Sequence, residues 1–192
     1  MSKLETNQVD PATGTTLTLG TSGDTITIPS GVTIANSGTA TGFGGANTPA
    51  FRARVTADTT FTTGTTTAVV FPSEDFDTAS AYDTSNGRFT VPSGQGGKYF
   101  IYSQLLVNAG AASQLEFAQI NLYKNGSQVR NIHTWFVDNF IRRTGFNFVT
   151  VEDLSAGDYL QIYVYADDST GNPDLYNDST NPNFFGAYKI IE

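Results

Sequence analysis

The sequence predicts an all-β protein in which a two-sheet sandwich head follows a short stalk rich in Thr and Gly. Short stretches of alternating apolar and polar residues recur along the chain, separated by turns that contain Gly, Pro, Asn or Asp. No stretch of useful length shows the apolar period of an α-helix. Eight to ten short strands at this spacing favour a two-sheet jelly roll.

Composition divides the chain into two parts. Residues 1–50 hold one aromatic residue, Phe43, together with twelve Thr and eight Gly, whereas the rest of the 14 Phe, 9 Tyr and one Trp lie later. The glycines of residues 42–47 suit a hinge between the two parts. We therefore expect an attachment or stalk segment over residues 1–45 and a head over residues 46–192.

Three short alternating segments stand in the first part, at residues 15–20, 24–29 and 31–34, and each offers one narrow apolar edge. Their six aliphatic side chains are too few to bury a core within one chain, but three chains wound together can bury them on a common axis. This stretch resembles segments near the start of fibre and appendage proteins of tailed bacteriophages, which bring those proteins to the virion. The other interpretation is a flexible linker that pairs with nothing.

The first strands of the head are expected from alternation and from the residues that end them. Residues 51–55 alternate and place their odd positions on one face. Residues 88–91 alternate and stop at Pro92, where a strand loses its backbone donor. The run 100–107 is aromatic and branched enough to be covered on both faces, as in a sandwich interior or a subunit interface.

Two turns in the second half of the head are expected from their own residues. Asn125-Gly126 is the strongest short signal for a hairpin, here within residues 115–129. Gly157 supplies a positive φ and Asp158 bonds the turn backbone. Further strands are expected over residues 144–151, 159–165 and 183–190.

One spaced set of residues carries a family resemblance. Phe71, Asp77, Tyr82 and Phe89 stand at spacings of six, five and seven, and Gly97-Lys98-Tyr99 follows. This set resembles the signature of the complement component 1q globular head, a trimer-forming jelly roll akin to tumour necrosis factor, and the likeness covers roughly residues 49–192.

The resemblance implies a homotrimer in which the Gly-x-Tyr strand and the last strand lie near the threefold axis. It thereby places Tyr99 and Phe185 at or near subunit contacts. The residues alone favour core positions for both side chains, since buried aromatic residues mostly serve packing.

Charge and composition exclude several classes of function. The net charge is −8, and no Lys or Arg stands between Lys3 and Arg52 or between Arg143 and Lys189. Phosphate backbones would be repelled, so we expect no nucleic-acid or anionic-membrane binding. No apolar stretch of about 18 residues is present to span a bilayer.

The chain lacks Cys, which excludes disulfides and thiolate sites. Its first residues do not lead into the apolar core of a secretion signal, so we expect assembly in a cytoplasm. His133 is the only histidine and no Gly-x-Ser-x-Gly elbow accompanies it, so triad hydrolysis is unsupported and no catalytic residue is assigned.

An acidic loop without Lys or Arg is expected over residues 166–182. It carries four carboxylates that are candidate calcium ligands, Asp167, Asp168, Asp174 and Asp178. A merely solvated acidic loop is the alternative, and no other cofactor is expected. The candidate ligand-binding residues, whose aromatic and amide groups suit sugars or protein surfaces, are Asn172, Tyr176 and Asn177 of this loop together with Trp135.

These observations lead to one functional prediction and three alternatives. The prediction is a non-enzymatic, homotrimeric virion appendage, assembled in the host cytoplasm, that attaches to other virion proteins through residues 1–45. Its head faces outward for adhesion to a host-surface glycan or protein. The alternatives are a purely structural decoration protein of capsid or tail, a bacterial exported lectin-like module and, last, an enzyme such as a depolymerase.

Overall fold

The computed structural model describes residues 9–38, 47–110, 114–136, 141–177 and 183–190. The chain divides into two compact units, Met1–Phe43 and Gly44–Glu192, and the second is called the head below. Across the described ranges, no helix is long and apolar enough to cross a membrane.

Residues 9–38 contain no β-strand in the single chain, and the burial of their three alternating segments between three chains stays a prediction. The segment forms two tight turns, in which the Asp24 N–H donates to the Thr21 carbonyl at 3.0 Å and the Val32 N–H to the Pro29 carbonyl at 3.2 Å. Its aliphatic side chains are exposed, Leu19 by 62%. The physical reason is that an alternating segment needs a partner strand and an apolar surface to cover it, and one chain supplies neither here.

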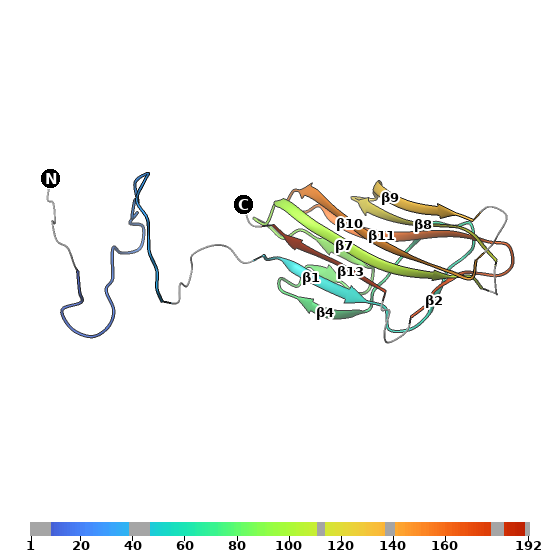
Figure 1. Ribbon diagram of the computed structural model, residues 1–192, viewed down its shortest axis with the longest axis horizontal. Helices are drawn as coiled ribbons and strands as arrows, with labels where there is room; N and C mark the ends of the chain where they lie inside the picture. Colours follow the sequence, from blue (N-terminus) through green and yellow to red (C-terminus); the bar gives the residue numbers. More distant parts are fainter. Residues whose placement is uncertain (1–8, 39–46, 111–113, 137–140, 178–182, 191–192) are drawn as a thin grey trace. The chain divides into compact units, whose positions relative to one another are not determined.

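The described residues of the head form thirteen strands in two antiparallel sheets (Figure 1). The strands are β1 (Ala50–Arg54), β2 (Thr59–Thr60), β3 (Thr67–Ala68), β4 (Ser73–Asp77), β5 (Tyr82–Asp83), β6 (Arg88–Thr90), β7 (Gly97–Asn108), β8 (Leu115–Lys124), β9 (Ser127–Trp135), β10 (Arg143–Leu154), β11 (Tyr159–Asp168), β12 (Asp174–Leu175) and β13 (Phe184–Lys189).

Sheet A has the order β2-β12-β7-β13-β1-β4, with β10 paired to β7, and sheet B has the order β5-β6-β11-β8-β9, with β3 paired to β11. This architecture confirms the all-β, two-sheet sandwich that the alternation predicted.

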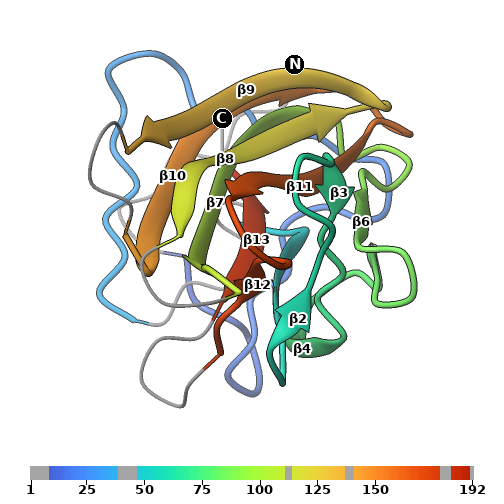
Figure 2. The same cartoon turned by 90° about the vertical axis from the view of Figure 1, so that its right-hand side faces the viewer.

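The register of sheet A fixes the two ends of the head. Ala50 of β1 lies opposite Tyr188 of β13, and the Lys189 N–H donates to the Pro49 carbonyl at 3.0 Å. The chain therefore enters and leaves the head at the same end. Strand β7 also begins there, because Phe100 pairs with Tyr188, and it runs to the opposite end, where β8 begins. Figure 2 views the head from that opposite end.

Both turns expected from their residues are present. Asn125 and Gly126 have φ angles of 52° and 78°, and they join β8 to β9 as the predicted hairpin. Gly157 has a φ of 87° between β10 and β11. There the Asp158 carboxylate accepts the Ser155 N–H at 2.8 Å, so the expected turn is confirmed.

The spaced aromatic residues build the core between the sheets. The Phe51 ring stacks on the Phe89 and Tyr82 rings at centroid distances of 4.6 and 4.8 Å, and it meets the Phe185 ring edge-on at 5.0 Å. The Asp77 carboxylate accepts the Tyr82 N–H at 2.8 Å, which fixes the start of β5. The spacing that carried the family resemblance is therefore a packing pattern in this chain.

Candidate functional site

The candidate functional site is the outer face of sheet A, the face that sheet B does not cover. It is formed by alternate side chains of three neighbouring strands, β7, β10 and β13. We call the following residues the outer face of sheet A: Phe100, Tyr102, Gln104, Leu106, Val149, Val151, Phe184 and Tyr188.

The aromatic residues of this face are in contact with one another. The Phe100 ring lies 5.2 Å from Tyr188 and 6.0 Å from Tyr102, and the Tyr102 ring lies 5.9 Å from Phe184. Gly186 makes this packing feasible, because a Cβ built on it would stand 2.5 Å from the Tyr102 ring. Partial burial among these groups raises the pKa of the Tyr102 hydroxyl.

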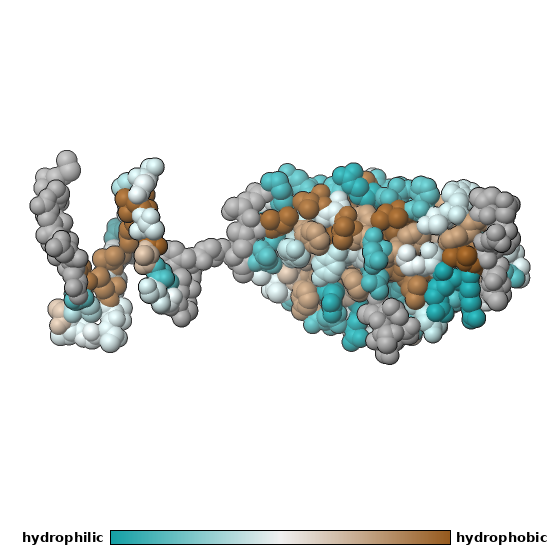
Figure 3. Space-filling model, viewed as in Figure 1, coloured by the Kyte–Doolittle hydropathy of each residue, from teal (hydrophilic) through white to brown (hydrophobic). Residues whose placement is uncertain are grey.

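The aliphatic residues of β10 leave the face open to solvent. Val149 is 65% exposed and Val151 46%, and they pair across the ladder with Tyr102 and Phe100. Figure 3 shows hydrophobic atoms gathered over β10, β7 and β13 on this side of the head. Charged groups lie to one flank, where the Arg52 and Arg54 guanidinium groups bind one carboxylate, Asp75, at 2.6 and 2.9 Å.

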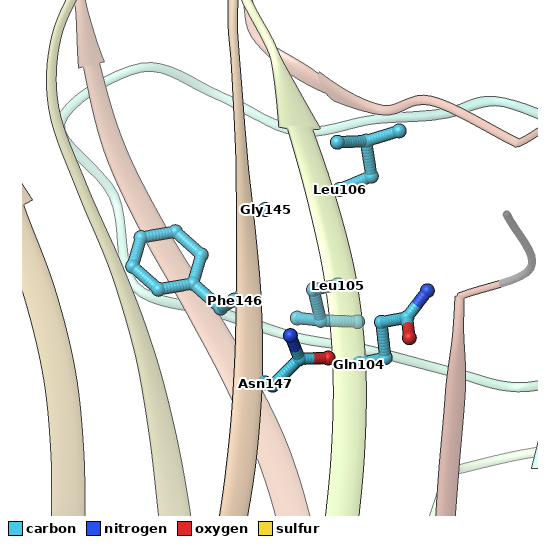
Figure 4. Close-up of a pocket in the computed structure, with 6 residues that line it drawn as sticks. All are labelled: Gln104, Leu105, Leu106, Gly145, Phe146 and Asn147. Atoms are coloured by element: carbon cyan, nitrogen blue, oxygen red, sulfur yellow. The ribbon is translucent and has the colours of Figure 1, made fainter.

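A pocket of about 260 Å³ opens on the same face between β7 and β10. Figure 4 shows its lining residues, Gln104, Leu105, Leu106, Gly145, Phe146 and Asn147. The hollow exists because Gly145, opposite Leu106 in the ladder, has no side chain to fill it. The pocket therefore belongs to the outer face of sheet A, where the Gln104 and Asn147 amides line it together with Leu106.

Tyr99 and Phe185 lie on the other side of the same sheet. Both are 0% exposed, and the Tyr99 hydroxyl donates to the Gln95 carbonyl at 2.6 Å. Burial raises the pKa of Tyr99 to about 12. These two side chains are core residues, as the residues alone suggested, and neither is available to a second chain here. Their neighbours Phe100 and Phe184 point outward instead.

In the described part of the acidic loop, the carboxylates are held by separate partners. Asp167 accepts the Tyr165 hydroxyl at 2.9 Å, and Asp168 accepts the Gly110 N–H at 2.6 Å. Asp178 lies outside the described residues. Within the described ranges, no group of three or more acidic or His residues is placed to hold a metal ion. Calcium ligation by these carboxylates therefore stays a prediction.

Asp174 belongs to a different, partly buried network. Its Oδ2 accepts the Asn108 amide at 3.0 Å, and the Arg143 guanidinium donates to the Asn108 Oδ1 at 3.3 Å. The same guanidinium lies 3.5 Å from the Tyr176 ring centroid. Burial raises the pKa of Asp174. This network fastens β12 to β7 and β10.

The predicted ligand-binding residues fall into two groups. The Asn172 Oδ1 accepts the Thr63 N–H at 3.2 Å, and the Asn177 N–H donates to Asp58 at 2.7 Å, so these residues, like Tyr176, hold the loop to the head. Trp135 stands in sheet B. Where the structure describes the chain, no ring contact or hydrogen bond joins it to the other three predicted residues.

Sequence reasoning missed the residues around Trp135. The Trp135 ring lies 4.8 Å from the Phe117 ring, and Phe117 also meets His133 and Tyr165, each at 5.7 Å. These residues come from three strands, so only the register of β8 with β9 and β11 brings them together. The signal available in the sequence was the alternation of polar and aromatic residues on each strand.

The two packed antiparallel sheets make the head a jelly-roll sandwich of the kind found in the complement 1q globular domain and in tumour necrosis factor. The globular domain of zebrafish complement 1qA protein is similar to this chain with a TM-score of 0.52 and 14% identity, over 74% of this chain and 97% of that one. Eiger tumour necrosis factor from S. frugiperda is similar with a TM-score of 0.54 and 13% identity, over 73% and 91%. At these identities the likeness establishes the fold. The sequence matches no protein-family model and no curated protein.

Proposed function

We propose that this protein is a non-enzymatic, homotrimeric appendage of a virion, in which the head is the recognition module and residues 1–45 attach it to other virion proteins. The observation that carries the trimer is the uncovered outer face of sheet A. A contiguous aromatic and aliphatic face on one side of a sandwich marks an interaction surface. Three equivalent chains would cover this face without leaving an open edge.

The amino-terminal segment supports the same assembly. Leu19, Ile26 and Val32 are exposed by 62, 59 and 56% in the single chain. Alternating segments with one apolar edge gain a core when equivalent segments from other chains meet them. The threefold symmetry of the heads would bring three such segments together, and the resemblance of this stretch to phage appendage proteins supports the virion as its place.

The mass of the protein in solution tests the trimer. Light scattering of the full chain is expected to give three times 20.6 kDa, and a truncated protein that begins at Thr48 is expected to give three times its own mass. A monomeric full chain would overturn the proposal. A trimeric full chain with a monomeric head would move the association to the amino-terminal segment.

A point variant locates the contact. Val149→Asp puts a charge on the outer face of sheet A and is expected to give a folded monomer, because the carboxylate would lose its water on association. The matched control is Thr90→Asp, which makes the same change from a β-branched residue on an exposed position of β6 in sheet B. Equal masses for the two variants would refute the assignment of the face.

The location is tested on particles. Antibodies against the head are expected to label purified virions at a defined position in electron micrographs. If the protein is absent from purified virions and is exported by a bacterial cell, the proposed virion location is refuted and the bacterial lectin-like alternative is favoured.

A further inference from the structure

Sheet B carries a second exposed surface that the trimer proposal leaves unused. Six side chains of β8, β9 and β11 on the side of sheet B away from the core form it, although two of them, Phe117 and Asn121, are buried at 8% and 1% exposure. We call the six residues the Trp135 platform: Phe117, Gln119, Asn121, His133, Trp135 and Tyr165. We infer that the Trp135 platform binds neutral hexose polysaccharide. The inference rests on the proposed function, since it names the ligand class of the outward-facing head.

The aromatic part of the platform has a buried floor and an exposed ring. Phe117 is only 8% exposed, although it points away from the core, because Trp135, His133 and Tyr165 surround it. Trp135 itself is 65% exposed. The floor holds the indole in place while leaving much of its surface to solvent, and an exposed aromatic ring beside polar groups can stack on the apolar face of a sugar ring.

The polar part of the platform lies beside these rings. Gln119 stands opposite His133 on one side and Tyr165 on the other, and its side-chain Nε2 donates to the side-chain Oδ1 of Asn121. Among the described residues, nothing hydrogen-bonds to the side-chain Oε1 of Gln119, the His133 ring nitrogens or the Trp135 indole N–H. Donors and acceptors are thus both open to a ligand, as hydroxyl-rich sugars require.

Charge selects the kind of sugar. The six side chains include no Lys or Arg, and among the described residues a carboxylate lies in contact with them, since Asp167 accepts the Tyr165 hydroxyl at 2.9 Å. The net charge of the chain is −8. Uronates, sialates and phosphorylated glycans would therefore meet repulsion without a partner, whereas neutral hexoses would not.

Size and position agree with this ligand. Residues on one face of a strand are about 7 Å apart, and three strands span roughly 10 Å, which suits one or two hexose rings. Phe117 is the third residue of β8, and Trp135 is the last residue of β9, so the platform lies toward the end of the head opposite to the one where the chain enters (Figure 1).

The only tryptophan of the chain reports directly on this surface. In the full-length protein, the Trp135 emission is titrated with maltohexaose, cellohexaose and mannohexaose, and with hexagalacturonate as the anionic comparison. A saturable shift of the emission is expected with at least one neutral hexasaccharide, with a Kd on the order of 1 mM for a single site. No shift is expected with hexagalacturonate.

Variants assign the response to the platform. Gln119→Ala keeps the fluorophore and is expected to weaken binding about tenfold, since an open acceptor is lost. Trp135→Ala is followed by calorimetry and is expected to abolish binding. The control is Phe76→Ala, which removes another exposed aromatic ring, 43% exposed, from sheet A and should leave binding unchanged.

Several results would overturn the inference. The inference is wrong if no neutral hexasaccharide shifts the Trp135 emission at concentrations up to about 10 mM. It is also wrong if hexagalacturonate shifts the emission equally, or if the Trp135→Ala variant still binds the neutral sugar. A lower mass of Trp135→Ala in light scattering would show that a second copy covers the platform, which also refutes it. A trimer that binds no sugar would leave the proposed trimer standing, so the two failures are distinguishable.

Discussion

The carboxylate of Asp158 is expected to stabilise the head by fastening two turns together. Its Oδ1 accepts a hydrogen bond from the side-chain Nδ2 of Asn125 at 2.7 Å. Its Oδ2 accepts the Ser155 backbone N–H at 2.8 Å and forms an ion pair with the Lys124 ammonium at 2.9 Å. The β8–β9 hairpin turn is thereby joined to the β10–β11 turn. Asp158→Asn keeps the shape of the side chain but removes the charge and turns an acceptor into a donor.

The magnitude follows from the pKa of this carboxyl group. Hydrogen bonds from Asn125, Lys124 and Ser155 lower the Asp158 pKa from 3.8 to about 2. A shift of this size corresponds to about 2 kcal/mol of stability as an upper limit. Because the carboxylate lies near the surface, solvent screening reduces this figure, and we expect Asp158→Asn to cost about 1 kcal/mol at neutral pH.

The dependence on pH has a definite sign. A lowered pKa contributes stability that is present above pH 3.8 and is lost as the pH falls through about 2. The difference in the free energy of unfolding between the wild type and Asp158→Asn should therefore be full at pH 6 and much smaller at pH 2. Urea denaturation at fixed protein concentration measures it.

The control is Asp153→Asn, the same change at an exposed carboxylate of β10 that has no hydrogen-bond partner for its side chain in the described part of the chain. This variant should be as stable as the wild type at both pH values. If Asp158→Asn is fully stable at pH 6, or if its deficit is the same at pH 2, the carboxylate does not join the turns as described.

Two further substitutions test the packing of sheet A. Phe185→Ala removes a ring that is 0% exposed and should lower the free energy of unfolding by about 3–5 kcal/mol. The control Phe76→Ala removes an exposed ring and should lower it far less. Similar losses for the two variants in chemical denaturation would contradict the assignment of Phe185 to the core. Gly186→Ala places a Cβ 2.8 Å from the Phe51 carbonyl oxygen as well as against Tyr102, and should cost about 1–3 kcal/mol. The control is Gly145→Ala, whose added Cβ would meet Leu106 at an ordinary contact distance of 3.7 Å. Equal melting temperatures for the two variants would refute the crowding at Gly186.

Turn residues allowed the most accurate predictions from sequence, because their signal is local. Asn125-Gly126 and Gly157 require positive φ angles that few residues adopt, and the structure has these angles at the expected places. The spaced aromatic residues Phe71, Tyr82 and Phe89 likewise lie in the core, since large apolar side chains between turns have few other positions.

The facing of β7 could not be decided from sequence. Phe100, Ile101 and Tyr102 are all apolar or aromatic, so the alternation of side chains along the strand does not show which of them face the core and which face outward. The structure places Ile101 in the core and the other two on the outer face. That choice depends on the partner sheet, which explains why the resemblance led to Tyr99 rather than Phe100 as a contact residue.

The Trp135 platform was beyond sequence reasoning for a related reason. Trp135 was identified by its chemistry, but its neighbours Phe117 and Tyr165 are far from it in the chain and become adjacent only through the ladder register. The acidic loop shows the converse. Asp167, Asp168 and Asp174 are close in sequence, yet each carboxylate is bound by a different backbone or side-chain partner.

The pairing of Ala50 with Tyr188 makes the head convenient to handle as a reagent. A tag or fluorescent protein joined after residue 190 would emerge beside residue 49, so immobilising the head at either of these two residues presents the same orientation to an analyte. The opposite end, where β8 begins and β9 ends, then stays unobstructed on a sensor chip or bead. Foreign peptides grafted at that end would be displayed clear of the support.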